Sequence, residues 1–142
     1  KKKKNVRGVS VYTLSERASD KEAEALARRE NQSDLIGGLD LATESTEVRN
    51  ILIDLTQRET LNQSSNYVEN LINEFKTRTK LLNRTHRFAG FAVLKAPDIP
   101  SVLIEMGYLS NKNDAKLLRT IDYQQKIVNS IYNATINYFN NY

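Results

Sequence analysis

The stretch that most constrains the fold of this chain is residues 101–111, with the sequence SVLIEMGYLSN. It opens with an apolar run, and short runs rich in β-branched residues between turn residues are typical of buried strands. Pro100 and a second proline precede the run, so a helix cannot continue into it. Asn111 is suited to cap a following helix. The pattern predicts a strand over 101–105 that ends in Glu105 and leads into a helix.

The position of Glu105 is open to two interpretations. Ligands of open α/β sheets bind outside the carboxyl ends of the strands, so a carboxylate there can take part in chemistry. A glutamate at a strand end more often forms a surface ion pair or caps a turn. Spacing alone leaves both interpretations standing.

Composition narrows the function classes. The chain has 142 residues and a formal charge of +4, and residues 1–4 are all lysine. The positive charge is concentrated at the N-terminal end, and no nucleic-acid-binding motif appears. A nucleic-acid-binding function is therefore only weakly supported. The absence of cysteine excludes disulfides and thiolate metal sites. No apolar stretch is long enough to span a bilayer. The chain begins without Met or a signal peptide, and we expect a processed product or a fragment.

Two segments before residues 101–111 have clear patterns. Residues 6–14 alternate as a strand does. Ser19 and Asp20 are suited to cap the helix that follows. A stripe at helical spacing places Glu30 on or beside the apolar face of that helix.

The other expected elements follow from turn residues and periodicity. Gly37-Gly38 breaks the pattern, which predicts a loop over 34–46. A helix over 47–78, either continuous or broken near 62–65, then leads into a loop over 77–88 that holds His86. The remaining expectations are a strand over 88–94 and a helical segment over 113–142. The final part of that segment is expected to open at Asp122.

One apolar stripe in the helix over 47–78 has two interpretations. It consists of Val48, Ile51, Leu52 and Leu55, at the spacing of one helix face. Such stripes are most often part of the core. The alternative is a docking face for a partner.

Three separated motifs carry a family resemblance. Residues 91–111 (FAVLKAPDIPSVLIEMGYLSN) closely resemble the C-terminal signature of zinc-dependent N-acetylmuramoyl-L-alanine amidases, the bacterial cell-wall amidases of the AmiA/AmiC type. Residues 8–14 (GVSVYTL) and the segment from Glu30 to Gly38 are similar to two further parts of that family. The similarity covers nearly all of the chain in order.

The resemblance implies a fold and an activity. The fold is α/β, a mostly parallel sheet flanked by helices on both faces, with the N-terminal strands missing from this chain. Residues 1–142 would be the C-terminal part of a single amidase catalytic domain. The activity is hydrolysis of the amide bond between N-acetylmuramic acid and L-alanine in peptidoglycan, by a zinc-activated water with Glu105 as general acid/base.

The resemblance also implies where the metal is held. The family's zinc ligands are a His, a Glu and a second His, all upstream of this chain. The chain has a single histidine, His86, and no cysteine, which is too few ligands for an ordinary zinc site. We expect His86 not to be a ligand. We therefore expect this polypeptide alone to bind zinc poorly and to be inactive.

Regulation and location follow from the same resemblance. Residues 31–60 match a regulatory, autoinhibitory helical insert, and Glu30 matches a glutamate that takes the open zinc position; Glu44 and Glu47 are weaker candidates. A LytM-type activator would remove the insert, and the protein would be exported to the periplasm for cell-wall remodelling and daughter-cell separation. The alternative is a non-catalytic fragment or interaction module that offers an activator-docking helix. No nucleic acid and no membrane span are expected.

Overall fold

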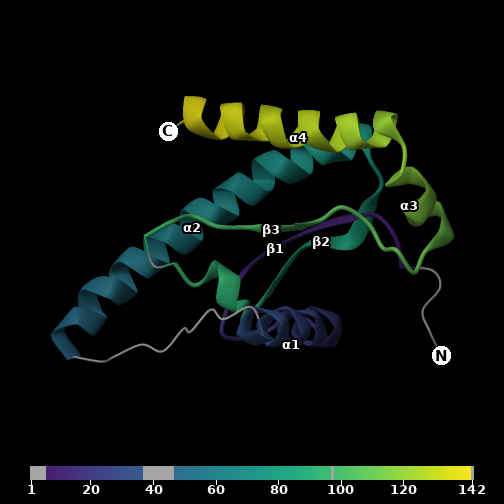
Figure 1. Ribbon diagram of the computed structural model, residues 1–142. Coiled ribbons are helices and arrows are strands. Elements are labelled where there is room, and N and C mark those ends of the chain that lie inside the picture. Colours follow the sequence, from purple (N-terminus) through teal and green to yellow (C-terminus); the bar gives the residue numbers. More distant parts are fainter. Residues whose placement is uncertain (1–5, 37–46, 97, 142) are drawn as a thin grey trace. The chain divides into compact units, whose positions relative to one another are not determined.

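The computed structural model describes residues 6–36, 47–96 and 98–141, with side chains of 34–36 and 47–56 outside the description. It has an α/β fold, as expected, in which helices and strands follow each other along the chain (Figure 1). The elements in order are β1 (Val9–Leu14), α1 (Lys21–Ile36), α2 (Glu47–Arg78), β2 (Leu81–Ala89), the 3-10 helix η1 (Ala92–Leu94), β3 (Leu103–Glu105), α3 (Lys112–Leu117) and α4 (Ile121–Asn140).

The described strands form a small mixed sheet with the order β2-β1-β3. The N–H of Val9 donates to the C=O of Lys80 at 2.8 Å, and the N–H of Ser15 donates to the C=O of Ala89 at 3.1 Å. Both partners advance in the same direction along the chain, so β1 and β2 are parallel.

The chain divides into two compact units. The first consists of the described parts of Lys1–Val11, Asn66–His86 and Ile104–Tyr142, and the second of those of Tyr12–Ser65 and Arg87–Leu103. Each unit has buried apolar side chains of its own.

The core of the first unit joins the second half of α2 to α4. Val68, Leu71 and Phe75 are fully buried at the spacing of one helix face. The hydroxyl groups of Tyr67 and Thr135 are 2.8 Å apart, which adds a polar contact between the two helices.

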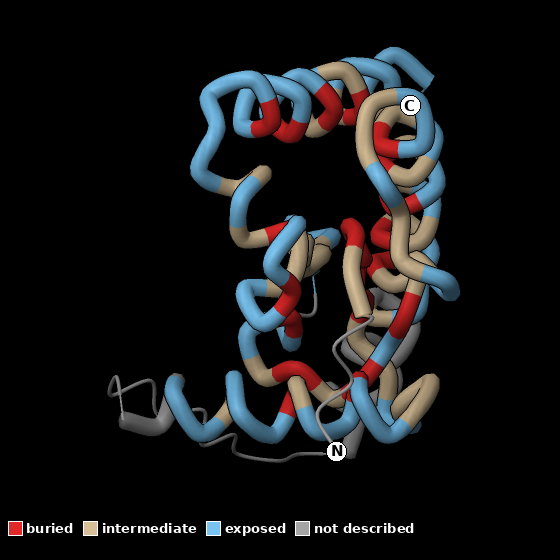
Figure 2. The backbone as a smooth tube through the Cα atoms, turned by 90° about the vertical axis from the view of Figure 1, so that its right-hand side faces the viewer, coloured by how far each residue is buried: buried red, intermediate tan, exposed pale blue. Residues whose placement is uncertain are grey.

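The core of the second unit packs α1 against the strand ends. The rings of Tyr12 and Phe91 meet edge to face, with their centroids 5.4 Å apart. Ala23 and Ala27 of α1 are buried in the same cluster. Figure 2 shows that exposed positions lie along the other side of the helices.

The expectation of a loop over 77–88 and a strand over 88–94 is wrong. The strand is β2, Leu81–Ala89, and residues 92–94 form η1. Several residues of β2 are polar, which is why the segment resembled a loop. Arg87 of this strand is buried, and its ion pair with Asp20 offsets the cost of burying the charge. The apolar residues after β2 lie in a turn instead of a strand. They still contribute to the core, because Phe91 and Leu94 are buried.

The helices differ from expectation at their ends. The backbone of α2 is continuous through residues 62–65, so the unbroken alternative is confirmed. The expected helix over 113–142 is two helices, and α4 is capped by Thr120 instead of opening at Asp122. Residues 34–36 belong to α1 instead of a loop, while residues 37–46, with Gly37-Gly38 and Glu44, lie outside the described residues.

Candidate functional site

Glu105 is the last residue of β3 and belongs to the first unit. Its side chain is half-buried, so the carboxylate lies neither in open solvent nor sealed in the core. The expected strand over 101–105 is confirmed at its end, although it begins at Leu103.

The direction of the chain after Glu105 depends on Gly107. The backbone there has a φ of +152°, and a Cβ atom would lie 3.3 Å from both Cβ and Oδ2 of Asp114. Only glycine combines that φ with that close approach at little cost.

The backbone is fixed on both sides of Gly107. The hydroxyl of Tyr123 donates to the C=O of Met106 at 2.9 Å. The N–H of Tyr108 donates to Oδ2 of Asp114 at 3.1 Å. The residue directly after Glu105 is therefore held by a tyrosine of α4, and the turn is held by an aspartate of α3.

Asp114 ties this turn to the start of the described chain. Its side chain is only 4% exposed. The N–H of Gly8 donates to Oδ2 at 2.8 Å, and Nε of Arg7 donates to Oδ1 at 3.2 Å. Both carboxylate oxygens thus have partners, as a buried charge requires.

Two polar side chains complete this arrangement. Asn111 caps α3 as expected, because its side-chain oxygen accepts from the N–H groups of Asn113 and Asp114. Burial raises the pKa of the Tyr123 hydroxyl, the negative charge of Asp114 raises it further, and Arg7 opposes the rise. Tyr123 therefore stays a hydrogen-bond donor to the turn at neutral pH.

Glu30 lies on α1 in the second unit. Its side chain is exposed, so it is not buried on the apolar face of the helix. The core cluster reaches only to Ala27, and Asn31 makes the next contact of the helix. The side-chain amide of Asn31 donates to the C=O of Gly90 at 2.9 Å and accepts from the N–H of Ala92 at 2.7 Å.

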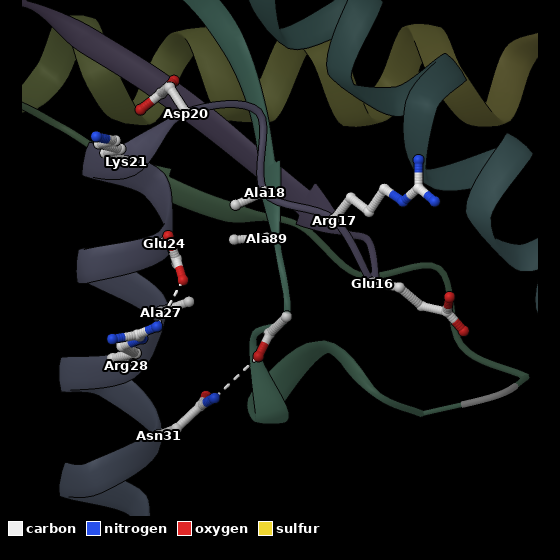
Figure 3. A pocket seen from close by; sticks show the side chains of 11 residues that line it. Glu16, Arg17, Ala18, Asp20, Lys21, Glu24, Ala27, Arg28, Asn31 and Ala89 are labelled. Atoms are coloured by element: carbon white, nitrogen blue, oxygen red, sulfur yellow. Dashed lines mark hydrogen bonds and ion pairs between the residues drawn. The ribbon is translucent and has the colours of Figure 1, made fainter.

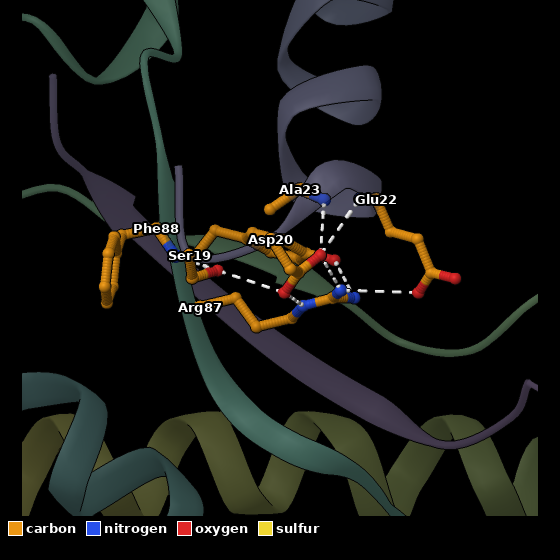
Figure 4. A network of polar contacts seen from close by, with 7 residues as sticks. Ser19, Asp20, Glu22, Ala23, Arg87 and Phe88 are labelled. Carbon is orange, nitrogen blue, oxygen red and sulfur yellow. Dashed lines mark hydrogen bonds and ion pairs between the residues drawn. The ribbon is translucent and has the colours of Figure 1, made fainter. Parts of the chain in front are cut away.

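A second polar cluster surrounds Asp20, the confirmed cap of α1 (Figure 4). Nε of Arg87 donates to Asp20 at 2.9 Å, and the guanidinium lies over the ring of Tyr12 at 5.7 Å from its centroid. Burial alone would raise the pKa of Asp20, but hydrogen bonds from Arg87 and from the N–H of Ala23 lower it to about 2. This cluster holds α1 against β2.

A hollow of about 550 Å³ lies beside α1 (Figure 3). Its charged lining is already engaged in part, since Arg28 pairs with Glu24 at 2.6 Å. Glu105 and Glu30 are not among its lining residues. The hollow therefore does not mark the position of the predicted catalytic carboxylate.

The described residues do not bring together a set of metal ligands. Within residues 6–36, 47–96 and 98–141, no three His, Cys, Asp or Glu side chains gather closely enough to hold an ion. His86 lies in β2 and is half-buried, and burial lowers its pKa against an opposing charge on Glu69. The residues described do not by themselves fit a zinc site.

The predicted cap at Asn111 is confirmed, whereas the sequence analysis gave Asp114 no central role. The structure places Asp114 under the turn after Glu105, where its carboxylate is the acceptor for three donors. The signal available was the pairing of Gly107 with a short polar residue seven positions later. The described helices include none that is both long and apolar enough to cross a membrane.

Comparison with known proteins adds a family match. The model of the Amidase_3 family, described as N-acetylmuramoyl-L-alanine amidase, matches residues 1–137. The chain is 38% identical over 133 residues to N-acetylmuramoyl-L-alanine amidase AmiA of Salmonella typhimurium and 35% identical to AmiA of Escherichia coli K12. Each match covers 93% of this chain and 46% of the relative. An AmiC amidase of Escherichia coli O6:H1 is 37% identical, with 32% of its length covered. The chain thus spans less than half the length of these relatives.

Proposed function

Because this chain belongs to the Amidase_3 family of N-acetylmuramoyl-L-alanine amidases, we propose that the protein it forms hydrolyses the amide bond between N-acetylmuramic acid and L-alanine in peptidoglycan. The relatives carry that amidase name, and peptidoglycan is the polymer that contains this bond. Glu105 is proposed as the general acid/base of the reaction.

The observation that carries the role of Glu105 is its placement. The carboxylate is half-buried at a strand end, directly before a turn that Tyr123 and Asp114 fix by hydrogen bonds of 2.9 and 3.1 Å. A general base needs an accessible carboxylate on a rigid support. Glu105 would take a proton from the attacking water and deliver it to the leaving amine of L-alanine.

Zinc is proposed as the metal of the whole protein, on the family resemblance. The described residues do not supply its ligands. The ligands would therefore come from residues other than those described. The complete fold would be a mostly parallel sheet with helices on both faces, of which residues 1–142 form the C-terminal part.

A charge-removing substitution tests the role of Glu105. In the whole protein, Glu105→Gln should lower the release of stem peptides with a free L-alanine amine from purified peptidoglycan by about 10²–10⁴-fold. Glu69→Gln, at an exposed position of the same unit, is the matched control. Full activity of the Glu105→Gln protein would refute the assignment.

Residues 31–60 are proposed as a regulatory insert, with Glu30 as the carboxylate that occupies the metal in the resting protein. The exposed side chain of Glu30 supports this proposal, because it is accessible to a site elsewhere. Glu30→Gln in the whole protein should raise basal hydrolysis, whereas Glu16→Gln, also exposed in the second unit, should not. Unchanged basal hydrolysis in the Glu30 variant would count against autoinhibition.

The partner and location proposals rest on the resemblance alone. A LytM-type activator would release the insert, and the protein would act in the periplasm during cell division. The stripe of Val48, Ile51, Leu52 and Leu55 lies on the helical backbone of α2, but its side chains are outside the description. A docking helix for the activator remains the alternative role, and activator binding without hydrolysis would support it.

A further inference from the structure

Ser10 is a buried side chain whose hydroxyl group has no hydrogen-bond partner in the structure. The residue lies in β1 and has no exposed surface, and its Oγ atom makes no hydrogen bond. Among the described residues, it is the only buried side-chain oxygen or nitrogen atom of this kind. Burying a hydroxyl without a hydrogen bond destabilises the folded state, so native proteins keep such a group mainly where it has a further role.

Ser10 and Glu105 point to the same face of the sheet. β3, which ends in Glu105, is the neighbour of β1 (Figure 1). The sheet is mixed and β1 is parallel to β2, so β3 runs antiparallel to β1. Leu103, the first residue of β3, packs against the core cluster that contains Tyr12. Side chains two residues apart in a strand share a face, so Ser10 follows Tyr12 and Glu105 follows Leu103 onto that face.

The two residues also lie at the same level of the sheet. Oδ2 of Asp114 accepts from the N–H of Gly8 at 2.8 Å, and a Cβ atom on Gly107 would lie 3.3 Å from the same oxygen. Gly8 and Gly107 therefore lie side by side. Ser10 is two residues after Gly8 and Glu105 is two residues before Gly107, so antiparallel pairing places Glu105 opposite Ser10. The Cβ atoms of opposite residues are about 4.5–5.5 Å apart, which is within reach of a hydrogen bond between the two side chains.

The partner of the Ser10 hydroxyl has to be one of its present neighbours. Because no part of Ser10 is open to solvent, a further segment of the protein cannot reach its Oγ atom from outside. Glu105 is half-buried on the same face, and its carboxylate oxygens are acceptors for a hydroxyl donor. A hydrogen bond from a hydroxyl to an ionised carboxylate is shorter and stronger than one between neutral groups.

We propose that Ser10 is a positioning residue for Glu105, whose carboxylate it holds by a hydrogen bond in the orientation that accepts a proton. The two side chains are not bonded to each other in the structure, and rotation about their side-chain torsions brings them together. Glu105 takes the proton of the attacking water, whereas the Ser10 hydroxyl keeps its own proton throughout. The inference rests on the proposed function, because it assigns Ser10 to the reaction in which Glu105 is the general acid/base.

Kinetics of a Ser10→Ala variant of the whole protein, on a soluble N-acetylmuramoyl peptide, separate positioning from a structural role. The substitution should lower kcat by about 10–100-fold, because a misoriented proton-transfer group slows the chemical step. KM should stay within about twofold of the wild-type value, since substrate binding is not changed. Urea denaturation should show equal or higher stability, because the variant loses a buried hydroxyl that had no partner.

Two further serine variants serve as controls. Ser130 is equally buried in the first unit, and its hydroxyl donates to the C=O of Lys126 at 2.8 Å. Ser130→Ala should therefore leave kcat unchanged. Ser10→Thr keeps a hydroxyl on a side chain suited to a strand, and it should restore most of the kcat that Ser10→Ala loses.

A double-mutant cycle tests whether Ser10 acts through Glu105. Ser10→Ala should have no further effect on kcat in a Glu105→Gln background, because residues that act as a unit are not additive. Equal losses in both backgrounds would overturn the inference. Wild-type kcat in Ser10→Ala beside an impaired Glu105→Gln protein would also overturn it, and would leave the proposed function standing. A fully active Glu105→Gln protein would remove both.

Discussion

Gly107 shows how a single missing side chain can shape the segment after Glu105. Its φ of +152° is one that side-chain-bearing residues rarely adopt, and Asp114 fills the space where a Cβ would stand. The same aspartate holds the N–H of Tyr108. A side chain at residue 107 would therefore contact the same carboxylate that holds the turn.

Gly107→Ala should lower the free energy of unfolding by about 1–3 kcal/mol, because it adds backbone strain and a contact at 3.3 Å. Urea denaturation measures the effect. Gly90→Ala is the control, since its Cβ would meet nothing closer than the C=O of Ser15 at 3.8 Å. Equal losses in the two variants would contradict the role given to Gly107.

Asp20 predicts a pH dependence of stability. Its folded pKa of about 2 lies below the ordinary value of 3.8, so the stabilisation is complete above about pH 4 and is lost as the pH falls toward 2. Asp20→Asn should cost about 1–2 kcal/mol at pH 6, and the difference from wild type should shrink between pH 4 and pH 2. Chemical denaturation at a series of pH values measures this difference. Glu24→Gln, in an exposed ion pair, should change stability by less than about 0.5 kcal/mol. A constant difference across the acid range would refute the account.

At the scale of elements, β2 is the most instructive departure from expectation. Its sequence, LLNRTHRFA, has the polarity of a loop. Nothing local indicates that Arg87 would be buried, because the carboxylate that pairs with it is 67 residues away in the chain. Hydrogen bonds to β1 decide the extended conformation, and they belong to the partner strand as much as to β2.

Helix starts were more predictable, because caps are local. Asp20 and Asn111 accept the N–H groups that follow them within three residues. The start of α4 was expected at Asp122, whereas the helix begins one residue earlier at Ile121, with Thr120 as its cap. Both residue types are suited to cap a helix, and the local sequence favours neither strongly.

At the scale of the whole molecule, the metal gives the sharpest prediction. Isothermal titration calorimetry of zinc into the 142-residue chain should show no tight site, because no three ligand side chains gather among the described residues. His86→Ala should leave the titration unchanged. One tight site with unit stoichiometry would refute this expectation and would place a metal centre within this chain.

The sequence by itself determined the α/β class, the family, the caps at Asp20 and Asn111 and the end of β3 at Glu105. These depend on patterns within about ten residues, or on motifs that stay together along the chain. Only the tertiary structure decided that β2 is a strand, that Glu30 is exposed, and that Asp114 supports the turn after Glu105. In each of these the deciding partner is distant in sequence or depends on where the core ends, and hydrogen-bond satisfaction of buried groups is settled only when those partners meet.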